Sequence, residues 1–515
     1  MVYLVGAGPG DPGLITLRGK QLLERAEVII YDYLASKKLL KYVPKDAEFI
    51  YAGKRGGVKH THTQDEINQM LVDRAKSGKM VVRLKGGDPF IFGRGGEEIE
   101  ELVEAGISFE VVPGVTSATA AATYAGIPIT HRKYTSTVAF VTGHEDPTKP
   151  DSKIAWDKLA TGVGTLVIYM GIKNLKTITE KLLKYGRDPQ TPVAVVRWAS
   201  TSEQRTVVGN LENIAEVVLK NKIKPPSLVV IGEVVNLRDT INWYEKRPLF
   251  SKRLVVTRTR EQASELVSLL ENHGAECVEF PTISLQPVDS YEVLDNALAE
   301  FDTYDWVLFS SMNAVDYFFS RLFEQGMDVR DLKGPWIGAV GRVTAEALAN
   351  RGIKADLLPE KFTGDGLAES LIAKGVQDQK ILIPRALKAR ESLPETLQAG
   401  GAVVTVAPVY QNVLPGSSVG EDLKADLQES LVAKSIDMVT FTSSSTVKNF
   451  VTLLDCQGPG ELAGLLDGIA VAAIGPITAQ TAEKYGLKVD VQPEEYTIPA
   501  MVDSIVRYFT AQEAS

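Results

Sequence analysis

The chain has 515 residues, of which 44% are hydrophobic and 7% aromatic, as in soluble proteins built from several globular domains. Its formal net charge of -9 argues against nucleic acid or an anionic membrane as the main partner. There is no apolar run of about 18 residues and no signal peptide, so we expect a cytoplasmic protein without a membrane span. The only cysteines, Cys277 and Cys456, are too few for a disulfide framework or a cysteine-rich metal site.

A glycine-rich segment, LVGAGPGDPG, occupies residues 4–13 within and after the first expected strand. It resembles a dinucleotide-binding loop, because two glycines are correctly spaced and a second strand, VIIYD, ends in Asp32. The third glycine of that fingerprint is absent: Asp11 stands there, and its Cβ would prevent close contact between helix and strand. We therefore expect a wider loop, a ligand other than a pyrophosphate, and a helix that begins only after Thr16 as its N-cap.

Strands and helices alternate along the rest of the chain. Apolar strands are expected at residues 80–84, 165–170 and 226–232, with helices such as residues 65–78 between them. This alternation predicts an α/β protein with mainly parallel sheets. A polar and aromatic connection, NWYEKRPLFSKR at residues 242–253, precedes a fresh strand, and we place the main domain boundary near residue 246.

The part of the chain after this boundary contains an internal repeat. DWVLFSSMNAV at residues 305–315 recurs as DMVTFTSSSTV at residues 437–447, and IGAVGRVTAEAL recurs as VAAIGPITAQTA. The repeat predicts two similar α/β lobes with a cleft between them. Such a pair of lobes would suit a binding protein as well as an enzyme.

Two further segments of the first half carry residues suited to ligand binding. In LKGGDPFIFGRGGEE, Gly86 and Gly87 permit close backbone approach and Asp88 can accept hydrogen bonds, although a simple turn has the same pattern. The segment at residues 52–62, AGKRGGVKHTH, has five basic or histidine side chains and no acid. It suits a polyanionic substrate, with a solvated loop as the alternative. Its two histidines lack a third ligand in the sequence, so no metal site is predicted.

Six segments, taken in order, closely resemble the uroporphyrinogen-III C-methyltransferases of the tetrapyrrole methylase superfamily. They are VGAGPGDPGLITLRG, VIIYDYL, GKRGG, RLKGGDPFIFGRGGEE, VVPGVTSATAAATYAGIPITHR and YMG, and the resemblance covers residues 1–245. It implies a two-lobed α/β fold around a cleft, distinct from Rossmann-like methyltransferases, and usually a homodimer. It also implies that S-adenosylmethionine lies against the GGD segment, with the GAGPGDP loop at the cleft.

Carried over position by position, the resemblance defines a cofactor site. Its residues would be Pro9, Gly86, Gly87, Asp88, Ile91, Thr116, Ser117, Met170 and Ala199. Relatives often carry alanine at the position of Ser117, and some carry glycine at that of Ala199. Judged alone, Met170 would be interpreted as a core methionine.

The implied reaction transfers two methyl groups from S-adenosylmethionine to pyrrole carbons of uroporphyrinogen III and gives precorrin-2. Alignment in a dry cleft is the main task, because the pyrrole is already nucleophilic and the sulfonium is a good leaving group. Asp32 and Lys54 match positions proposed as proton acceptor and proton donor, and the methylated macrocycle must indeed lose a proton. Arg55 and Arg132, with Lys133, would bind the substrate's carboxylates.

Residues 252–510 resemble uroporphyrinogen-III synthase through VVTR, FSSMNAV, AVGRVTAEAL, PVYQN, FTSSSTV and AAIGPITAQTAEKYG. The resemblance implies two lobes joined by a two-stranded connection, with the first strands completing the lobe formed by the C-terminal part. The implied reaction closes hydroxymethylbilane with inversion of its last pyrrole and needs no cofactor.

Hydroxyl and backbone N–H groups are the candidates for this second site. Tyr410 matches the position proposed to protonate the leaving hydroxyl, with a core tyrosine as the alternative. The candidates for contact with substrate carboxylates, several of them at helix starts, are Ser310, Ser311, Thr344, Ser443, Ser444 and Thr478. Ordinary helix capping by Thr344 and Thr478 is an equal alternative.

The sequence therefore predicts a bifunctional enzyme with a two-lobed tetrapyrrole methylase fold followed by a two-lobed, internally repeated synthase fold. Its expected partners are tetrapyrrole substrates and a second copy of the methyltransferase half, without nucleic acid or membrane. Two alternatives stay open: a dinucleotide-dependent oxidoreductase that uses the first glycine loop, and a two-lobed solute-binding protein.

Overall fold

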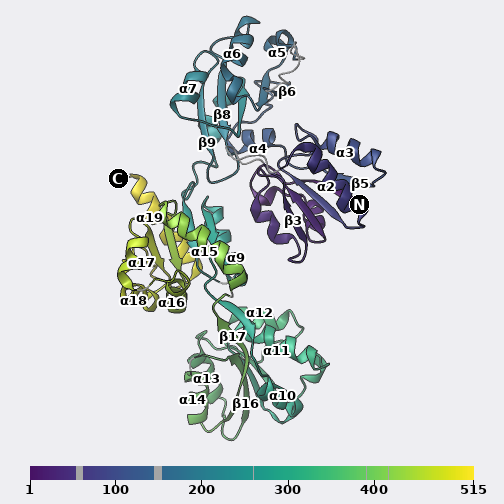
Figure 1. Cartoon of the computed structure of the whole chain (residues 1–515). Coiled ribbons are helices and arrows are strands. Elements are labelled where there is room, and N and C mark those ends of the chain that lie inside the picture. The colour runs from purple at the N-terminus through teal and green to yellow at the C-terminus, as the bar shows by residue number, and fades with distance from the viewer. Residues whose placement is uncertain are drawn as a thin grey trace. The chain divides into compact units, whose positions relative to one another are not determined.

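The computed structural model of the chain is shown in Figure 1, and it describes residues 1–53, 62–143, 154–258, 260–389, 391–415, 417–456 and 458–514. Two compact units are present. Unit 1 consists of Met1–Arg253, Ser268–Cys277 and Val506–Ser515, and unit 2 of Leu254–Val267 and Val278–Ile505. The domain boundary near residue 246 stays a prediction.

The first sheet of unit 1 has five parallel strands in the order β3-β2-β4-β1-β5. They are β1 (Val2–Gly6), β2 (Val28–Tyr31), β3 (Glu48–Tyr51), β4 (Val81–Lys85) and β5 (Phe109–Val112). Helices α1 (Leu17–Leu23), α2 (Gln64–Lys76) and α3 (Gly95–Glu104) supply apolar residues to cores on its two faces. Neighbouring residues of β1 alternate between these cores, Leu4 in one and Val5 in the other, so the sheet is buried on both sides.

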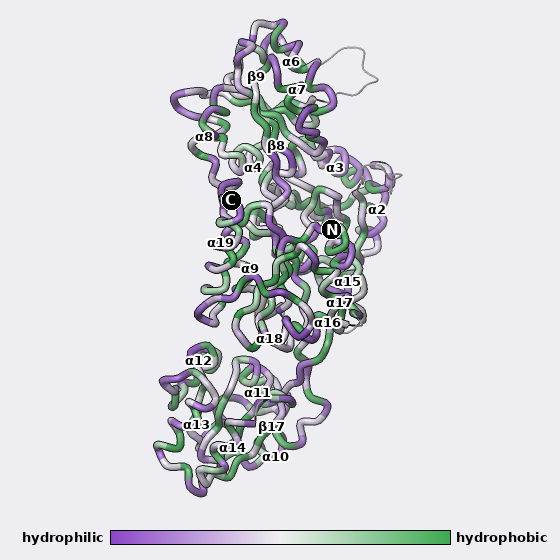
Figure 2. The backbone as a smooth tube through the Cα atoms, turned by 90° about the vertical axis from the view of Figure 1, so that its left-hand side faces the viewer, coloured by the Kyte–Doolittle hydropathy of each residue, from purple (hydrophilic) through white to green (hydrophobic). Residues whose placement is uncertain are grey.

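The second sheet of unit 1 has the order β6-β7-β10-β8-β9. Its strands are β6 (Val138–Thr142), β7 (Thr165–Tyr169), β8 (Pro192–Arg197), β9 (Arg205–Asn210) and β10 (Ser227–Ile231), with helices α4 (Ser117–Tyr124), α5 (Trp156–Gly162), α6 (Leu175–Lys184), α7 (Ile214–Lys220) and α8 (Arg238–Ile241). In this sheet β6 pairs in parallel with β7. The other three pairs, β7 with β10, β10 with β8 and β8 with β9, are antiparallel. The expectation of mainly parallel sheets is therefore wrong for this sheet. Figure 2 shows β8 as a hydrophobic strand, in keeping with its burial.

The C-terminal half of the chain forms two more sheets. One has the order β12-β11-β18-β19, from β11 (Arg253–Val256), β12 (Glu276–Glu279), β18 (Met438–Phe441) and β19 (Ala470–Ala473). Its first strand, β11, pairs in parallel with β18, which lies far along the chain. The expectation that early strands complete the C-terminal lobe is confirmed by this pairing.

The other sheet has the order β13-β17-β16-β14-β15. Its strands are β13 (Ser284–Pro287), β14 (Trp306–Phe309), β15 (Trp336–Ala339), β16 (Lys380–Ala386) and β17 (Val403–Val413). The antiparallel pair β13 and β17 agrees with the expected two-stranded connection. The helices of this half are α9 (Arg260–Asn272), α10 (Glu292–Ala299), α11 (Met312–Glu324), α12 (Arg342–Ala349), α13 (Gly364–Ile372), α14 (Ser392–Ala399), α15 (Ser417–Val432), α16 (Ser444–Leu453), α17 (Pro459–Leu465), α18 (Pro476–Lys484) and α19 (Ile498–Ala514).

The internal repeat is visible in corresponding details of the two lobes. In each lobe a parallel bridge extends the sheet edge, at Gly338–Leu357 and at Ala472–Val491. In each, an aspartate just before the bridging residue accepts a hydrogen bond from a backbone N–H of the neighbouring strand. Within the part of the chain that the structure describes, helix length and hydropathy leave no candidate for a membrane-spanning segment.

Candidate active sites

Three loops of unit 1 meet at the carboxyl edge of its first, parallel sheet. The Gly87 N–H donates to the Gly8 carbonyl oxygen at 2.7 Å, and the Gly8 N–H donates back to the Gly87 carbonyl oxygen at 3.2 Å. A Cβ at Gly6 would lie 2.5 Å from the backbone nitrogen of Gly114, and a Cβ at Gly114 would lie 2.3 Å from the Gly87 oxygen. Glycine is therefore required where these loops touch, because any side chain would push their backbones apart.

Asp88 ties two of these loops together. Its Oδ1 accepts hydrogen bonds from the backbone N–H groups of Phe90 at 2.8 Å and Ile91 at 3.2 Å, and its Oδ2 accepts one from Gly114 at 3.0 Å. Hydrogen bonds to an ionised acceptor are among the stronger ones in proteins. Asp88 thus shapes the loops around the expected cofactor, whether or not it also contacts a ligand.

The remaining cofactor candidates lie around Tyr169, the last residue of β7 in the second sheet of unit 1. The Thr116 hydroxyl lies 2.5 Å from the Tyr169 hydroxyl. Ala199 belongs to the same hydrophobic cluster as Tyr169, and Ile91 packs against that cluster. Met170 follows directly, with a positive φ of 53° and a side chain that is 52% exposed. The interpretation of Met170 as a core residue is wrong, and a strained, exposed residue at a strand end is typical of a functional position.

The wide loop after β1 packs against residues 199–201. A Cβ at Gly10 would lie 2.7 Å from the Thr201 methyl group, and the Asp11 N–H donates to the Ser200 hydroxyl at 3.2 Å. Asp11 also caps the short helix Pro12–Leu14, and its Oδ2 accepts a hydrogen bond from the Tyr124 hydroxyl at 2.7 Å. The aspartate in place of the third glycine therefore has a structural role, and α1 begins after Thr16 as expected.

The nine predicted cofactor residues lie in these segments. Pro9 stands between the Gly8 bridge and Gly10, and Gly86 directly precedes Gly87. The Cβ position of Gly87 is 3.7 Å from the backbone nitrogen of Ser117, the first residue of α4. The structure thus brings the nine positions together, and their contact with S-adenosylmethionine stays a prediction.

Asp32 lies at the same edge, directly after β2. Its carboxylate accepts a hydrogen bond from Arg83 Nη2 at 2.6 Å, and 27% of its side chain is exposed. Arg83 Nε also donates to Glu98 Oε1 at 3.2 Å, and Lys85 Nζ donates to the same oxygen at 2.6 Å. Burial, together with the charge of Arg83, lowers the pKa of Lys85.

These partners of Asp32 were missed by the sequence reasoning. The signal was present, since Arg83 and Lys85 are charged residues in the otherwise apolar strand β4, and buried charges are rare unless they are paired. Glu98 gave no such signal, because it stands among exposed acids at the start of α3.

The basic residues expected to bind substrate are only partly described. Lys54 and Arg55 lie outside the described residues. The preceding Gly53 is packed against the Asp32 loop, since a Cβ there would lie 2.4 Å from the Tyr33 nitrogen. Arg132 is exposed in a turn closed by the bridge between His131 and Thr135.

In the C-terminal half, Tyr410 and Ser311 come together. Tyr410 is 8% exposed on β17, its hydroxyl lies 3.4 Å from the Ser311 hydroxyl, and its ring stacks on Tyr317 with centroids 5.4 Å apart. A register shift between Arg385 and Ala386 of β16 lies where β16 pairs with Tyr410. Bulges of this kind re-aim side chains. Tyr410 is thus mostly buried and held next to a second hydroxyl.

The starts of α12 and α18 do not agree with the alternative that Thr344 and Thr478 are helix caps. The N-caps of α12 and α18 are Gly341 and Gly475, and neither makes a side-chain cap. Thr344 and Thr478 are instead buried third residues of these helices, so capping by them is wrong. Ser311 caps α11 and Ser443 caps α16 with its side chain, so part of their hydrogen-bonding capacity is used. Ser310 and Ser444 flank these caps and are half-buried.

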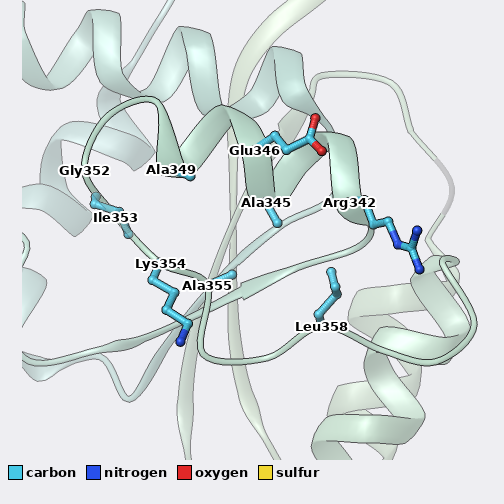
Figure 3. Close-up of a pocket in the computed structure, with 9 residues that line it drawn as sticks. All are labelled: Arg342, Ala345, Glu346, Ala349, Gly352, Ile353, Lys354, Ala355 and Leu358. Carbon is cyan, nitrogen blue, oxygen red and sulfur yellow. The ribbon is translucent and has the colours of Figure 1, made fainter.

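A cavity of about 600 Å³ lies beside α12 (Figure 3). Arg342 and Glu346 come from α12, whereas Lys354 and Leu358 come from the segment that follows it. Arg342 and Lys354 are exposed. None of the predicted site residues lines this cavity.

Comparison with known proteins identifies both halves. The Tetrapyrrole (Corrin/Porphyrin) Methylases match residues 1–215, and the family Uroporphyrinogen-III synthase HemD matches residues 264–503. A relative from Ruminiclostridium josui, described as Porphyrin biosynthesis protein HemD, is 38% identical over 506 residues, which are 98% of this chain and 97% of the relative.

Other relatives match the N-terminal half. An S-adenosyl-L-methionine-dependent uroporphyrinogen III methyltransferase of Methanosarcina barkeri is 55% identical over 240 residues, 47% of this chain and 94% of the relative. A solved uroporphyrin-III C-methyl transferase of Thermus thermophilus, complexed with S-adenyl homocysteine, is 42% identical, with a TM-score of 0.40 over 46% of this chain and 99% of that one. The chain therefore belongs to the tetrapyrrole methylases through its N-terminal half and to the uroporphyrinogen-III synthases through its C-terminal half.

Proposed function

We propose that the C-terminal half closes hydroxymethylbilane to uroporphyrinogen III and that the N-terminal half methylates this product twice to precorrin-2. Membership of both families within one chain is the observation that carries the proposal. The product of the first reaction is the substrate of the second, so the two activities are consecutive.

The residues at the carboxyl edge of the first sheet of unit 1 fit S-adenosylmethionine. The loops at Gly8, Gly87 and Gly114 bring backbone close together. The exposed Met170, with a φ of 53°, follows Tyr169, whose hydroxyl lies 2.5 Å from that of Thr116. When bound, S-adenosylmethionine supplies a methyl group on a sulfonium sulfur, which keeps the electron pair of the broken C–S bond as the new C–C bond forms. The loops would hold the reactants in line and exclude water.

Asp32 is proposed as the proton acceptor of this half. Each methylated macrocycle is cationic and must lose a proton, and a carboxylate at the edge of the site can accept it and pass it to solvent. Its partial exposure of 27% suits this task, because the oxygen not bound by Arg83 can face the substrate. Lys54, proposed as the proton donor, follows the segment that packs against the Asp32 loop.

Tyr410 is proposed as the proton donor of the synthase half. Loss of hydroxide from hydroxymethylbilane is easier when the leaving oxygen is protonated, and a phenol can supply that proton. The nearby Ser311 hydroxyl, at 3.4 Å, can orient the phenol or help to return its proton. The helix starts at Gly341 and Gly475 offer uncapped N–H groups to substrate carboxylates.

We further propose that the methylase half forms a homodimer and that the protein acts in the cytoplasm. Both follow from what is usual in the family and from the sequence reasoning above. Size-exclusion chromatography with light scattering tests the first proposal, and a monomer at micromolar concentration would contradict it.

The test of function supplies the full-length protein with hydroxymethylbilane, with and without S-adenosylmethionine, under anaerobic conditions. We expect the type III isomer without the methyl donor and a dimethylated product with it, identified by isomer analysis and mass. An unmethylated product in the presence of the donor, or type I isomer alone, would contradict the corresponding half. Binding of NAD(P) in place of S-adenosylmethionine would favour the oxidoreductase alternative.

A further inference from the structure

Ala199, one of the expected cofactor residues, lies in a strained turn directly after β8. Its two neighbours, Trp198 and Ser200, have positive φ angles of 47° and 65°. Such angles are unfavourable for residues that carry a Cβ, and they persist only where surrounding contacts enforce them. Ala199 and Ser200 are both buried, so the contacts that enforce the turn are internal.

This turn touches two loops of the first sheet of unit 1. The Asp11 N–H donates to the Ser200 hydroxyl at 3.2 Å, and a Cβ at Gly10 would lie 3.2 Å from the same hydroxyl oxygen. The Trp198 ring contacts the ring of Tyr33, in the loop after β2, with centroids 5.9 Å apart. The conformation of the turn therefore affects both the first glycine loop and the loop after β2.

A buried glutamine, Gln204, holds the turn. Its Oε1 accepts a hydrogen bond from the backbone N–H of Ser200 at 2.9 Å, and the residue is 3% exposed. Its Nε2 donates to the Tyr124 carbonyl oxygen at 3.0 Å and to Glu245 Oε1 at 2.8 Å. Both ends of the amide are thus paired, as buried polar groups require, and the place of Oε1 depends on the partners of Nε2.

Glu245 lies in the connection between the two halves of the chain and is itself firmly held. Its Oε1 also accepts a hydrogen bond from the Thr206 hydroxyl of β9 at 2.6 Å, and its Oε2 accepts one from Arg238 of α8. Its side chain is only 15% exposed. The preceding residue, Tyr244, packs its ring on that of Tyr124 with centroids 4.7 Å apart. These charge-assisted bonds and ring contacts fix the carboxylate in place.

We propose that Glu245 is a positioning residue of the methylase site, which acts through Gln204 on the turn at Ala199. The inference rests on the proposed binding of S-adenosylmethionine next to that turn. Without the carboxylate, Gln204 Nε2 loses its charged acceptor and the amide can rotate. The Ser200 N–H then loses its partner, and the turn relaxes toward ordinary φ values. The connection is thereby a part of the methylase site as well as the link to the synthase half.

The expected effect is on the binding of the methyl donor. Glu245→Ala should weaken S-adenosylmethionine affinity by about 10-fold, as is typical when one hydrogen bond to a charged group is lost. The KM for S-adenosylmethionine should rise by a similar factor with kcat changed less, because a turn beside the cofactor contributes mainly uniform binding. Gln204→Leu should have the same effect, since it removes the link itself.

The experiment uses the full-length protein and measures S-adenosylmethionine affinity by titration calorimetry, methylation of preformed uroporphyrinogen III, and thermal unfolding. The variants are Glu245→Ala, Gln204→Leu and their combination. Because both residues act on one path, the double variant should bind no more weakly than Gln204→Leu alone. If Glu245→Ala is not folded, Glu245→Gln removes the charge at similar volume and takes its place.

Thr206→Val is the matched control. It removes a hydrogen bond to the same Glu245 oxygen but leaves the link to Gln204 in place, so we expect a lower unfolding temperature at unchanged affinity. Formation of the type III isomer should be the same in all variants, because the substitutions lie outside the synthase half.

A non-additive loss of affinity, with Thr206→Val binding like the unmodified protein, supports the inference. Additive losses, unchanged affinity in either single variant, or an equal loss in Thr206→Val overturn it, the last because general destabilisation would then explain the effect. The proposed function fails separately: an unmodified protein that does not bind S-adenosylmethionine would remove the cofactor site and the inference with it.

Discussion

Replacement of Asp88 by alanine tests whether this residue holds the cofactor loops in shape. The change removes one acceptor group that serves three backbone donors, at 2.8, 3.2 and 3.0 Å. A hydrogen bond to a charged group contributes about 1.5–3 kcal/mol when buried, but Asp88 is only half-buried and water can replace part of it. At about 1 kcal/mol for each donor, Asp88→Ala lowers the free energy of unfolding of the methylase part by about 3 kcal/mol.

This loss has two readouts in the same protein. For a unit of this size, a change of 1 kcal/mol moves the unfolding temperature by about 2–4 °C, so a decrease of about 10 °C is expected for the methylase transition in scanning calorimetry. Because the loops that Asp88 joins border the expected cofactor, titration calorimetry is expected to show S-adenosylmethionine affinity reduced by about 10- to 100-fold.

The two readouts together separate the possible roles of Asp88. A residue that only contacted the ligand would lower affinity without changing the unfolding temperature, and a residue that only anchored a distant turn would do the reverse. Asp73→Ala, an exposed aspartate on α2, is the control for loss of charge alone. Unchanged unfolding and unchanged affinity in Asp88→Ala would refute the reasoning for both roles.

Two other substitutions test the glycine contacts at the edge of the first sheet and the proton donor of the synthase half. Gly6→Ala would place a methyl group 2.5 Å from the Gly114 nitrogen, so we expect a lower unfolding temperature and weakened S-adenosylmethionine binding, whereas Gly162→Ala, with nothing within 4 Å, should behave like the unmodified protein. A Gly6→Ala protein as stable as Gly162→Ala would show that the loops separate freely. Tyr410→Phe should slow ring closure by about 10- to 100-fold at unchanged stability, since the phenol is lost but its stacking on Tyr317 is kept. The ratio of type III to type I isomer measures this, and an unaltered ratio and rate would return Tyr410 to the core-tyrosine alternative.

Most of the fold could be predicted because its elements are strongly patterned. The expected strands at 80–84, 165–170 and 226–232 correspond to β4, β7 and β10, each shifted by at most one residue at an end. The pairing of β8, β9 and β10 could not be predicted in the same way. An apolar run is equally compatible with parallel and antiparallel neighbours, and the decision depends on connections such as residues 198–204.

The candidate site was predictable to the extent that its residues are marked by local composition. Glycines and an aspartate after strands are such marks, and their convergence at one edge follows from the parallel sheet. Met170 carried no mark, because neither its φ of 53° nor its exposed side chain is indicated by the residues around it in the sequence. The same holds for Thr344, since a threonine near a helix start is compatible with a cap, and only the structure places Gly341 there.

The pairing of β11 with β18 imposes an order on the synthesis of this chain. β11 lies between β12 and β18. Leu254 pairs with Met438, so 438 - 254 = 184 further residues must leave the ribosome before β11 has its second neighbour. At about 5–20 residues per second this takes on the order of 10–40 s. The lobe built from β13 to β17 is continuous in sequence and can fold within that interval. Throughout it, the edge of β11 that later pairs with β18 remains unpaired, and a chain interrupted before β18 would keep that edge exposed and open to aggregation.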